Sequence, residues 1–70
     1  MQEMIQISLA AARVNAKLTQ DDVAKAMKVS KNTIVAWENG KVEPKISQAR
    51  ELSSLYRIPL DNIFLPSKSN

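Results

Sequence analysis

Hydrophobic residues recur at helical spacing in five short stretches of the chain, and polar or helix-breaking residues separate these stretches. Ser8, Thr19 and Ser30 stand directly before three of the stretches, where a side-chain oxygen can cap the first turn of a helix. Gly40 ends the third stretch, and Pro59 precedes the fifth. The pattern therefore predicts helices at about residues 9–16, 20–27, 31–39, 47–56 and 60–64.

A chain of 70 residues is long enough for one domain. A domain of this size buries only about 60% of its unfolded surface, so one compact core has to stabilise it. We expect residues 1–66 to form this domain, with residues 4–7 as an extended lead-in and residues 67–70 as a flexible tail. The predicted fold class is all-α, a compact five-helix bundle.

Only about three residues separate the second and third predicted helices, which is the spacing of a helix-turn-helix. On a helical wheel, Ile34 and Trp37 share one side of the third helix. Asn32, Ala36 and Asn39 point to the opposite side. Short side chains suit a surface that lies flat against the edges of base pairs. The pattern thus indicates a third helix that is held out to enter the major groove of DNA.

The wheel also places a charged residue on the inner side of the third helix. Glu38 falls beside Ile34, and an unpaired buried carboxylate costs several kcal/mol. Arg13 lies on the apolar side of the first predicted helix, so we expect Arg13 and Glu38 to form a structural ion pair. The alternative is that both are solvated charges at the ends of flexible stems.

Composition narrows the classes of function. The chain has no cysteine and no histidine, which excludes disulfides, thiolate or imidazole metal sites and the common nucleophilic systems. Its single glycine cannot form a phosphate-cradling loop. Asp21 and Asp22 are best interpreted as first-turn residues that complement a helix dipole. We therefore expect no enzyme, no metal, no cofactor and no small-molecule substrate.

The net charge is weaker evidence about binding partners than the composition is about function. A net charge of +3 and a pI near 9.5 are compatible with a nucleic-acid partner, but many other domains share them. The first residues lack the basic start and the long apolar run of a signal peptide or a membrane span. The expected location is therefore the cytoplasm, without a membrane partner.

Several short motifs at specific spacing are typical of a known family. They are Arg13, LTQ at 18–20, VA at 23–24, VS at 29–30, Ile34, WENG at 37–40, Pro44 and LDNIF at 60–64. In these motifs the chain resembles the Cro and phage-repressor family of helix-turn-helix regulators, also called the xenobiotic-response-element family. It is most similar to the small single-domain regulators of phages and integrative elements. The resemblance implies a lambda-repressor-like bundle, with the helix-turn-helix at the second and third helices.

The resemblance also implies roles for individual residues. The base-reading positions of the family fall on Lys31, Asn32, Thr33 and Ala36. The positions that contact backbone phosphates fall on Gln20, Asn39 and Lys41, and Lys28 adds charge near the same backbone. Arg13 and Glu38 match an internal ion pair of the family, in agreement with the wheel.

Plainer interpretations stay open for three of these residues. Lys31 could be a solvated lysine or a phosphate contact, Asn32 a surface amide, and Gln20 an inert first-turn residue. Two departures from the family also matter, because Lys17 and Lys28 occupy helix ends where the family often has glycine. A lysine there costs about 1 kcal/mol if the left-handed conformation is kept.

The resemblance implies a sequence-specific regulator of transcription, and we expect a repressor. Its partner would be double-stranded DNA with a palindromic operator, bound by a homodimer. Ile58, Leu60 and Leu65 are candidates for the dimer surface. The alternative is a protein-interaction module of the same fold, such as an antitoxin or the target of an anti-repressor. An exposed apolar patch on the last two helices would indicate that alternative.

Overall fold

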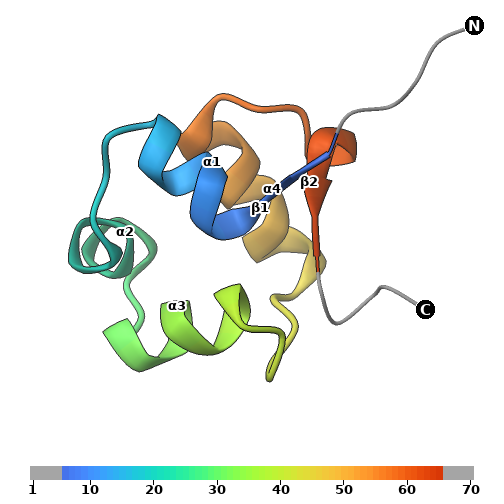
Figure 1. Cartoon of the computed structure of the whole chain (residues 1–70). Helices are drawn as coiled ribbons and strands as arrows, with labels where there is room; N and C mark the ends of the chain where they lie inside the picture. The colour runs from blue at the N-terminus through green and yellow to red at the C-terminus, as the bar shows by residue number, and fades with distance from the viewer. Residues whose placement is uncertain (1–5, 66–70) are drawn as a thin grey trace, which may run out of the picture.

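The computed structural model of the chain describes residues 6–65, and it is mainly helical (Figure 1). Helices α1 to α3 follow one another closely, and α4 crosses behind α1. A single 3₁₀ turn, η1, and two very short strands complete the described chain. The elements are β1 Ile7–Ser8, α1 Leu9–Asn15, α2 Gln20–Met27, α3 Lys31–Glu38, α4 Ile46–Tyr56, η1 Leu60–Asn62 and β2 Ile63–Phe64.

The predicted N-caps of the first three helices are confirmed. Ser8 Oγ accepts a hydrogen bond from Ala11 N at 3.0 Å, and Ser30 Oγ accepts one from Thr33 N at 3.2 Å. Thr19 caps α2, because its Oγ1 accepts from Asp22 N at 3.0 Å while Thr19 N donates to the Asp22 carboxylate at 2.9 Å. These reciprocal bonds form a capping box. The hydrogen bond from Thr19 N lowers the pKa of Asp22.

The prediction of a fifth helix at residues 60–64 is wrong. Leu60–Asn62 form one 3₁₀ turn, and the chain then becomes extended at Ile63, with φ −103° and ψ 125°. Ile63 pairs with Ile7 in a two-stranded parallel sheet, which joins the two ends of the described chain. The β-branched Ile63 favours this extended backbone and is buried in the core. The fold therefore has four α-helices and a small sheet, so the predicted count of five helices is wrong, while the predicted all-α helix-turn-helix type is confirmed.

The other predicted boundaries differ from the observed ones by one residue at most. The first and third helices end one residue earlier than predicted, and the fourth begins one residue earlier, at Ile46. In the predicted lead-in, Ile7 is extended as part of β1. Residues 4–5 and the predicted flexible tail at residues 67–70 lie outside the described residues.

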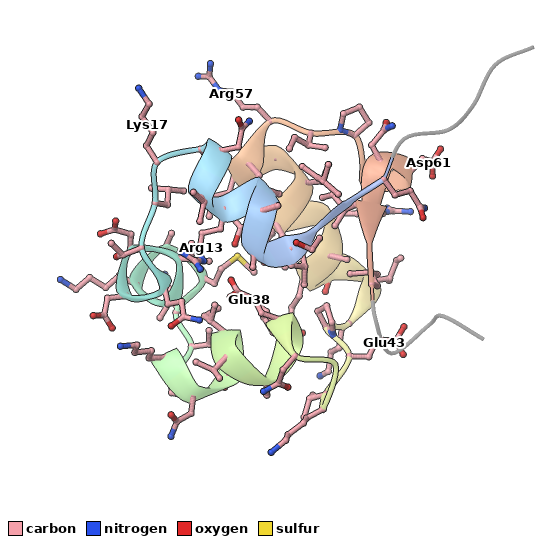
Figure 2. All side chains as sticks on the ribbon, viewed as in Figure 1. Arg13, Lys17, Glu38, Glu43, Arg57 and Asp61 are labelled. Carbon is pink, nitrogen blue, oxygen red and sulfur yellow. The ribbon has the colours of Figure 1, made fainter. Side chains whose placement is uncertain are left out.

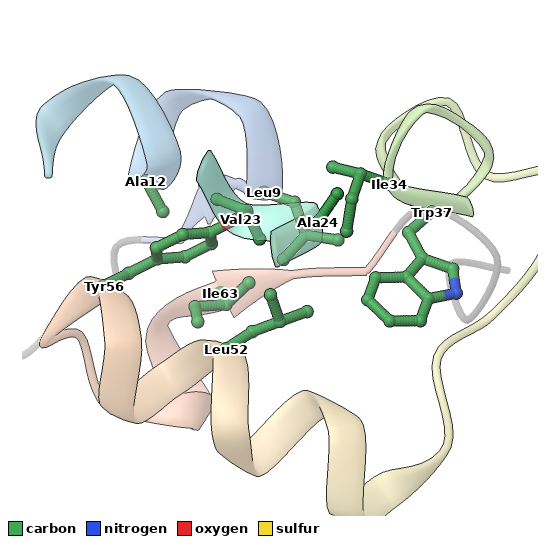
Figure 3. Close-up of a cluster of buried hydrophobic side chains, with 9 residues drawn as sticks. All are labelled: Leu9, Ala12, Val23, Ala24, Ile34, Trp37, Leu52, Tyr56 and Ile63. Atoms are coloured by element: carbon green, nitrogen blue, oxygen red, sulfur yellow. The ribbon is translucent and has the colours of Figure 1, made fainter. Parts of the chain in front are cut away.

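One hydrophobic cluster joins the four α-helices and β2 (Figure 3). Two alanines occupy close contacts in it: Ala12 on α1 is fully buried, and Ala24 on α2 is nearly so. A small side chain at position 24 allows α2 and α3 to pack closely, as the helix-turn-helix requires. The cluster consists of Leu9, Ala12, Val23, Ala24, Ile34, Trp37, Leu52, Tyr56 and Ile63.

Three helices are followed, within two residues, by a basic residue with left-handed backbone. Lys17 and Lys28 have φ values of 63° and 60°, so both keep the left-handed conformation although neither is glycine. Arg57, after α4, has φ 58°, and sequence reasoning did not single it out. A cation near a helix C-terminus is stabilised by the helix dipole, which offsets part of the cost of this conformation.

Replacing Lys28 with glycine should stabilise the protein relative to replacing it with alanine. Both variants remove the same charge, but only alanine keeps a Cβ atom that crowds the left-handed backbone. We expect Lys28→Gly to be more stable than Lys28→Ala by about 1 kcal/mol in urea unfolding. Equal stability of the two variants would contradict the left-handed geometry at this residue.

The hydroxyl of Tyr56 provides a spectroscopic probe of the core. Burial and the nearby Glu38 charge raise the pKa of Tyr56 to about 12, and the Arg13 charge opposes this shift. Because the folded-state pKa lies above the unfolded value, the neutral phenol stabilises the fold below pH 10. This contribution is lost as the pH rises from 10 toward 12.

We therefore expect the absorbance of tyrosinate to appear only well above pH 10, together with alkaline unfolding. The chain contains a single tyrosine, so the signal has one source. A Tyr56→Phe variant controls for other alkaline effects. Ionisation near pH 10 in a protein that remains folded would contradict the burial of this side chain.

Candidate nucleic-acid interface

Helix α3 is anchored on one side and open on the other. Ile34 and Trp37 are only 1% and 3% exposed, so this side of the helix belongs to the core. Lys31 and Asn32 are exposed, and Ala36 is half-buried. The helix lies at the edge of the molecule, below α1 and α2 in the view of Figure 1. The structure thus presents the polar side of α3 outward, as the helical wheel predicts.

The connection between α2 and α3 has the length expected of a helix-turn-helix. Lys28 ends α2 in the left-handed conformation, and Val29 N donates to Ala24 O at 3.0 Å. Ser30 then caps α3. Because Ala24 is buried where the two helices meet, α2 supports the inner side of α3 and leaves its outer side free.

Arg13 and Glu38 form the ion pair that the sequence predicts between the first and third helices. Arg13 Nε lies 2.7 Å from Glu38 Oε2, and the two side chains are only 15% and 9% exposed. Arg13 Nη1 also donates to Leu18 O at 3.0 Å, in the loop before α2. The hydrogen bond to Glu38 raises the pKa of the Arg13 guanidinium. Figure 2 shows the two side chains between α1 and α3.

Gln20 has a partner that sequence reasoning missed. Its Nε2 donates to Glu38 Oε1 at 3.0 Å, so the start of α2 is tied to the end of α3. The same residue lines a surface hollow with Arg13, Leu18, Thr19, Asp21 and Lys31. The structure therefore brings one expected phosphate contact, Gln20, next to one expected base contact, Lys31. No sequence pattern signals a hydrogen bond that depends on how α2 is placed against α3.

The segment after α3 is ordered by hydrogen bonds to its own backbone. Asn39 Oδ1 accepts from Lys41 N at 3.1 Å. Lys41 N and Val42 N also donate to Ala36 O at 3.0 and 3.3 Å. These backbone amides are thus engaged inside the protein. The Asn39 amino group and the exposed Lys41 ammonium are donors that this segment can offer to a ligand.

The hydroxyl of Thr33 has a hydrogen-bond partner at the start of α3. Thr33 Oγ1 lies 3.0 Å from Ser30 Oγ, within hydrogen-bond distance of the cap that starts α3. Lys28, by contrast, is exposed in the turn that precedes α3. Of the eight expected DNA contacts, six lie on α3 or in the segment after it, and the Thr33 hydroxyl is within hydrogen-bond distance of the Ser30 cap.

Residues 6–65 contain neither a metal-binding cluster of carboxylates nor a membrane-spanning helix. Within this range, no three carboxylates lie close enough together to bind a metal ion. No helix in the same range has the length and apolar character to cross a membrane.

Comparison with known proteins agrees with this geometry. The model of a family described as Helix-turn-helix matches residues 9–63. The chain belongs to this family. Its members of the Cro and phage-repressor type are DNA-binding regulators of transcription and not enzymes. The matched region runs from the start of α1 to the start of β2, so it includes the whole helix-turn-helix and the core around it.

Individual relatives are regulators by name. The cryptic phage CTXphi transcriptional repressor RstR of Vibrio cholerae is 34% identical over 58 residues, which cover 83% of this chain and 52% of the repressor. The uncharacterized HTH-type transcriptional regulator MJ0272 of Methanocaldococcus jannaschii is 38% identical over 48 residues, or 69% of this chain and 73% of that protein. A regulator of Archaeoglobus fulgidus, also uncharacterized, is 30% identical over 53 residues. The chain thus spans about half the length of the phage repressor, and no solved structure matches it significantly.

Proposed function

We propose that the protein is a transcriptional repressor that binds a specific duplex site by inserting α3 into the major groove. The orientation of α3 carries the proposal, because Ile34 and Trp37 hold the helix while Lys31 and Asn32 face outward. The name of the phage repressor among the relatives supports repression. Since the partner is DNA, we place the protein in the cytoplasm.

Each outward residue of α3 has a base edge that it can read. The Lys31 ammonium can donate to O6 and N7 of guanine, and the Asn32 amide can form two hydrogen bonds with adenine. The Ala36 methyl can contact the methyl group of thymine. Thr33 supports the site differently, because its hydroxyl also interacts with Ser30. Lys31 and Asn32 are therefore the main specificity residues of the proposal.

The phosphate backbone is contacted on both sides of the inserted helix. Gln20 and Lys28 lie before α3 in the chain, and Asn39 and Lys41 follow it. Contacts of this kind fix the position of the helix in the groove without selecting a sequence.

Selection of bound sequences from a random duplex pool tests the proposal. We expect one sequence to emerge, with an affinity at least about 10³-fold higher than that for a scrambled duplex at the same salt concentration. Equal affinity for every duplex would contradict a sequence-specific regulator.

Removing the Lys41 charge should weaken binding to all sequences alike. We expect Lys41→Ala to lower the slope of log affinity against log salt concentration by about 1, because one phosphate contact is lost. Lys25→Ala removes the same charge from an exposed position on α2 outside the proposed interface, and should change the slope less. A change in base preference with Lys41→Ala, at an unaltered slope, would contradict the backbone role.

We further propose that two copies bind one palindromic operator, because a single helix reads only a few base pairs. The expected dimer residues Ile58, Leu60 and Leu65 are half-buried. Ile58 and Leu65 also pack against the protein's own core, which reduces the surface they can offer a second copy. Sedimentation with and without operator measures the stoichiometry. Two protomers per site are expected, and one protomer at saturation would contradict the dimer.

In the described part of the chain, the exposed apolar side chains do not favour the alternative of a protein-interaction module. Such a module would show an apolar patch on α4 and η1. Within residues 6–65, the large apolar residues that are well exposed are Val14, Val42 and Ile46, and only Ile46 belongs to either element. We therefore keep DNA recognition as the proposed function.

A further inference from the structure

The carboxylate of Glu38 connects three elements that meet beside the proposed DNA surface. It accepts hydrogen bonds from Arg13 on α1, with Nε at 2.7 Å and Nη2 at 3.4 Å. It also accepts one from Gln20 Nε2 at the first residue of α2, at 3.0 Å. Glu38 itself is the last residue of α3. Glu38, on the helix that is proposed to read the bases, thus holds the Gln20 amide, which is expected to contact a phosphate.

The hydrogen bond to Glu38 restricts the Gln20 amide. A free glutamine side chain samples many rotamers, and a phosphate that binds it has to restrict them at a cost in affinity. In this structure one Nε2–H already donates to Glu38, so the amide is held before DNA arrives. The second Nε2–H remains available as a donor for a phosphate oxygen.

A carboxylate near a phosphate would be repulsive if it were unpaired. Arg13 removes this difficulty, because its guanidinium lies against both oxygens of Glu38. The nearby surface hollow carries the charges of Arg13, Lys31 and Asp21. With Glu38 included, two positive charges balance two negative ones. Loss of Arg13 alone would leave the neighbourhood of Gln20 negative.

We propose that Glu38 is a positioning residue for DNA binding: it fixes the Gln20 amide for a backbone phosphate, while Arg13 neutralises its charge. This inference rests on the proposed function, because it assigns the ion pair a role in the contact between Gln20 and DNA. The plain alternative is that the three side chains only stabilise the fold. The two accounts differ in one measurable quantity. This quantity is the extent to which the contribution of Gln20 to DNA affinity depends on the Arg13–Glu38 ion pair.

A double-mutant cycle on DNA affinity measures this dependence. Arg13→Met and Glu38→Leu together replace the pair with apolar side chains and leave the net charge at +3. Replacing a buried ion pair in this way often preserves folding. We expect Gln20→Ala to weaken binding of the selected duplex about tenfold in the wild-type protein. In the pair variant we expect the same change to weaken binding less than about twofold, because the amide is no longer held.

The control background is Arg50→Met with Glu51→Leu, which removes one charge of each sign from exposed positions on α4. There Gln20→Ala should still cost about tenfold. An equal cost of Gln20→Ala in all three backgrounds would overturn the positioning role while leaving the proposed function intact. If the wild-type protein prefers no duplex at all, the proposed function itself fails.

A second measurement does not depend on the folding of any variant. We expect the Gln20 side-chain amide of the DNA-free wild-type protein to be as rigid as the backbone in NMR relaxation, with an order parameter of about 0.8. The side-chain amide of Gln48 is an internal comparison for this order parameter. Its carbonyl oxygen caps α4 at an exposed site, where it accepts a hydrogen bond from Lys45 N at 2.9 Å. An order parameter below about 0.6 for the Gln20 amide would overturn the inference.

Discussion

Replacing Trp37 with alanine is expected to destabilise the protein by about 3–5 kcal/mol, which is enough to leave a domain of this size largely unfolded. The indole is 3% exposed and lies in the cluster shared by all four α-helices (Figure 3). Its removal leaves a cavity under α3 that neighbouring side chains fill only in part. The measurement is urea unfolding followed by far-ultraviolet circular dichroism, because the variant loses the only tryptophan.

Val42→Ala provides the comparison for this prediction. Val42 is 52% exposed in the segment after α3, so its truncation should change stability by no more than about 0.5 kcal/mol. A Trp37→Ala protein with a wild-type urea midpoint would show that the indole does not anchor α3. The proposed orientation of α3 would then lose its main support.

Replacing Asn32 with alanine is expected to weaken binding of the selected duplex by about 1–3 kcal/mol and to relax the preference at one base pair. The reason is chemical, because alanine cannot form the two hydrogen bonds that an amide makes with adenine. Asn32 is exposed on the outer side of α3, so protein stability should change little. The measurement is the affinity for a set of duplexes that differ from the selected site at single positions.

The chain offers two matched substitutions for comparison. Asn15→Ala changes the same amide at the exposed end of α1 and should leave DNA binding unchanged. Asn39→Ala should weaken all duplexes alike, because Asn39 is proposed to contact a phosphate. If Asn32→Ala and Asn39→Ala gave the same profile across the set, the division between base and backbone contacts would be contradicted.

Local features of the fold could be predicted from the sequence because they depend on few neighbours. The caps at Ser8, Thr19 and Ser30 need only one hydroxyl and the first turn of a helix. The inward Glu38 could be matched with Arg13, because a carboxylate on a buried helix side requires a compensating charge. The outward side of α3 followed from helical periodicity alone, and the burial of Ile34 confirms it.

Features that depend on several distant segments could not be predicted. The pairing of Ile7 with Ile63 involves two-residue strands, which are too short to show any alternation in sequence. The left-handed backbone at Arg57 has no signature, because arginine is also common inside helices. The hydrogen bond from Gln20 to Glu38 depends on how α2 is placed against α3. The separate roles of the residues expected to contact DNA remain predictions.

Methylation interference on the selected duplex tests most directly whether α3 reads the major groove. Methylation of guanine at N7 blocks the major groove, whereas methylation of adenine at N3 blocks the minor groove. We predict that N7 methylation at the guanine read by Lys31 abolishes binding, and that N3 methylation of adenine within the same half-site is tolerated. Interference confined to adenine N3 would contradict the insertion of α3 into the major groove.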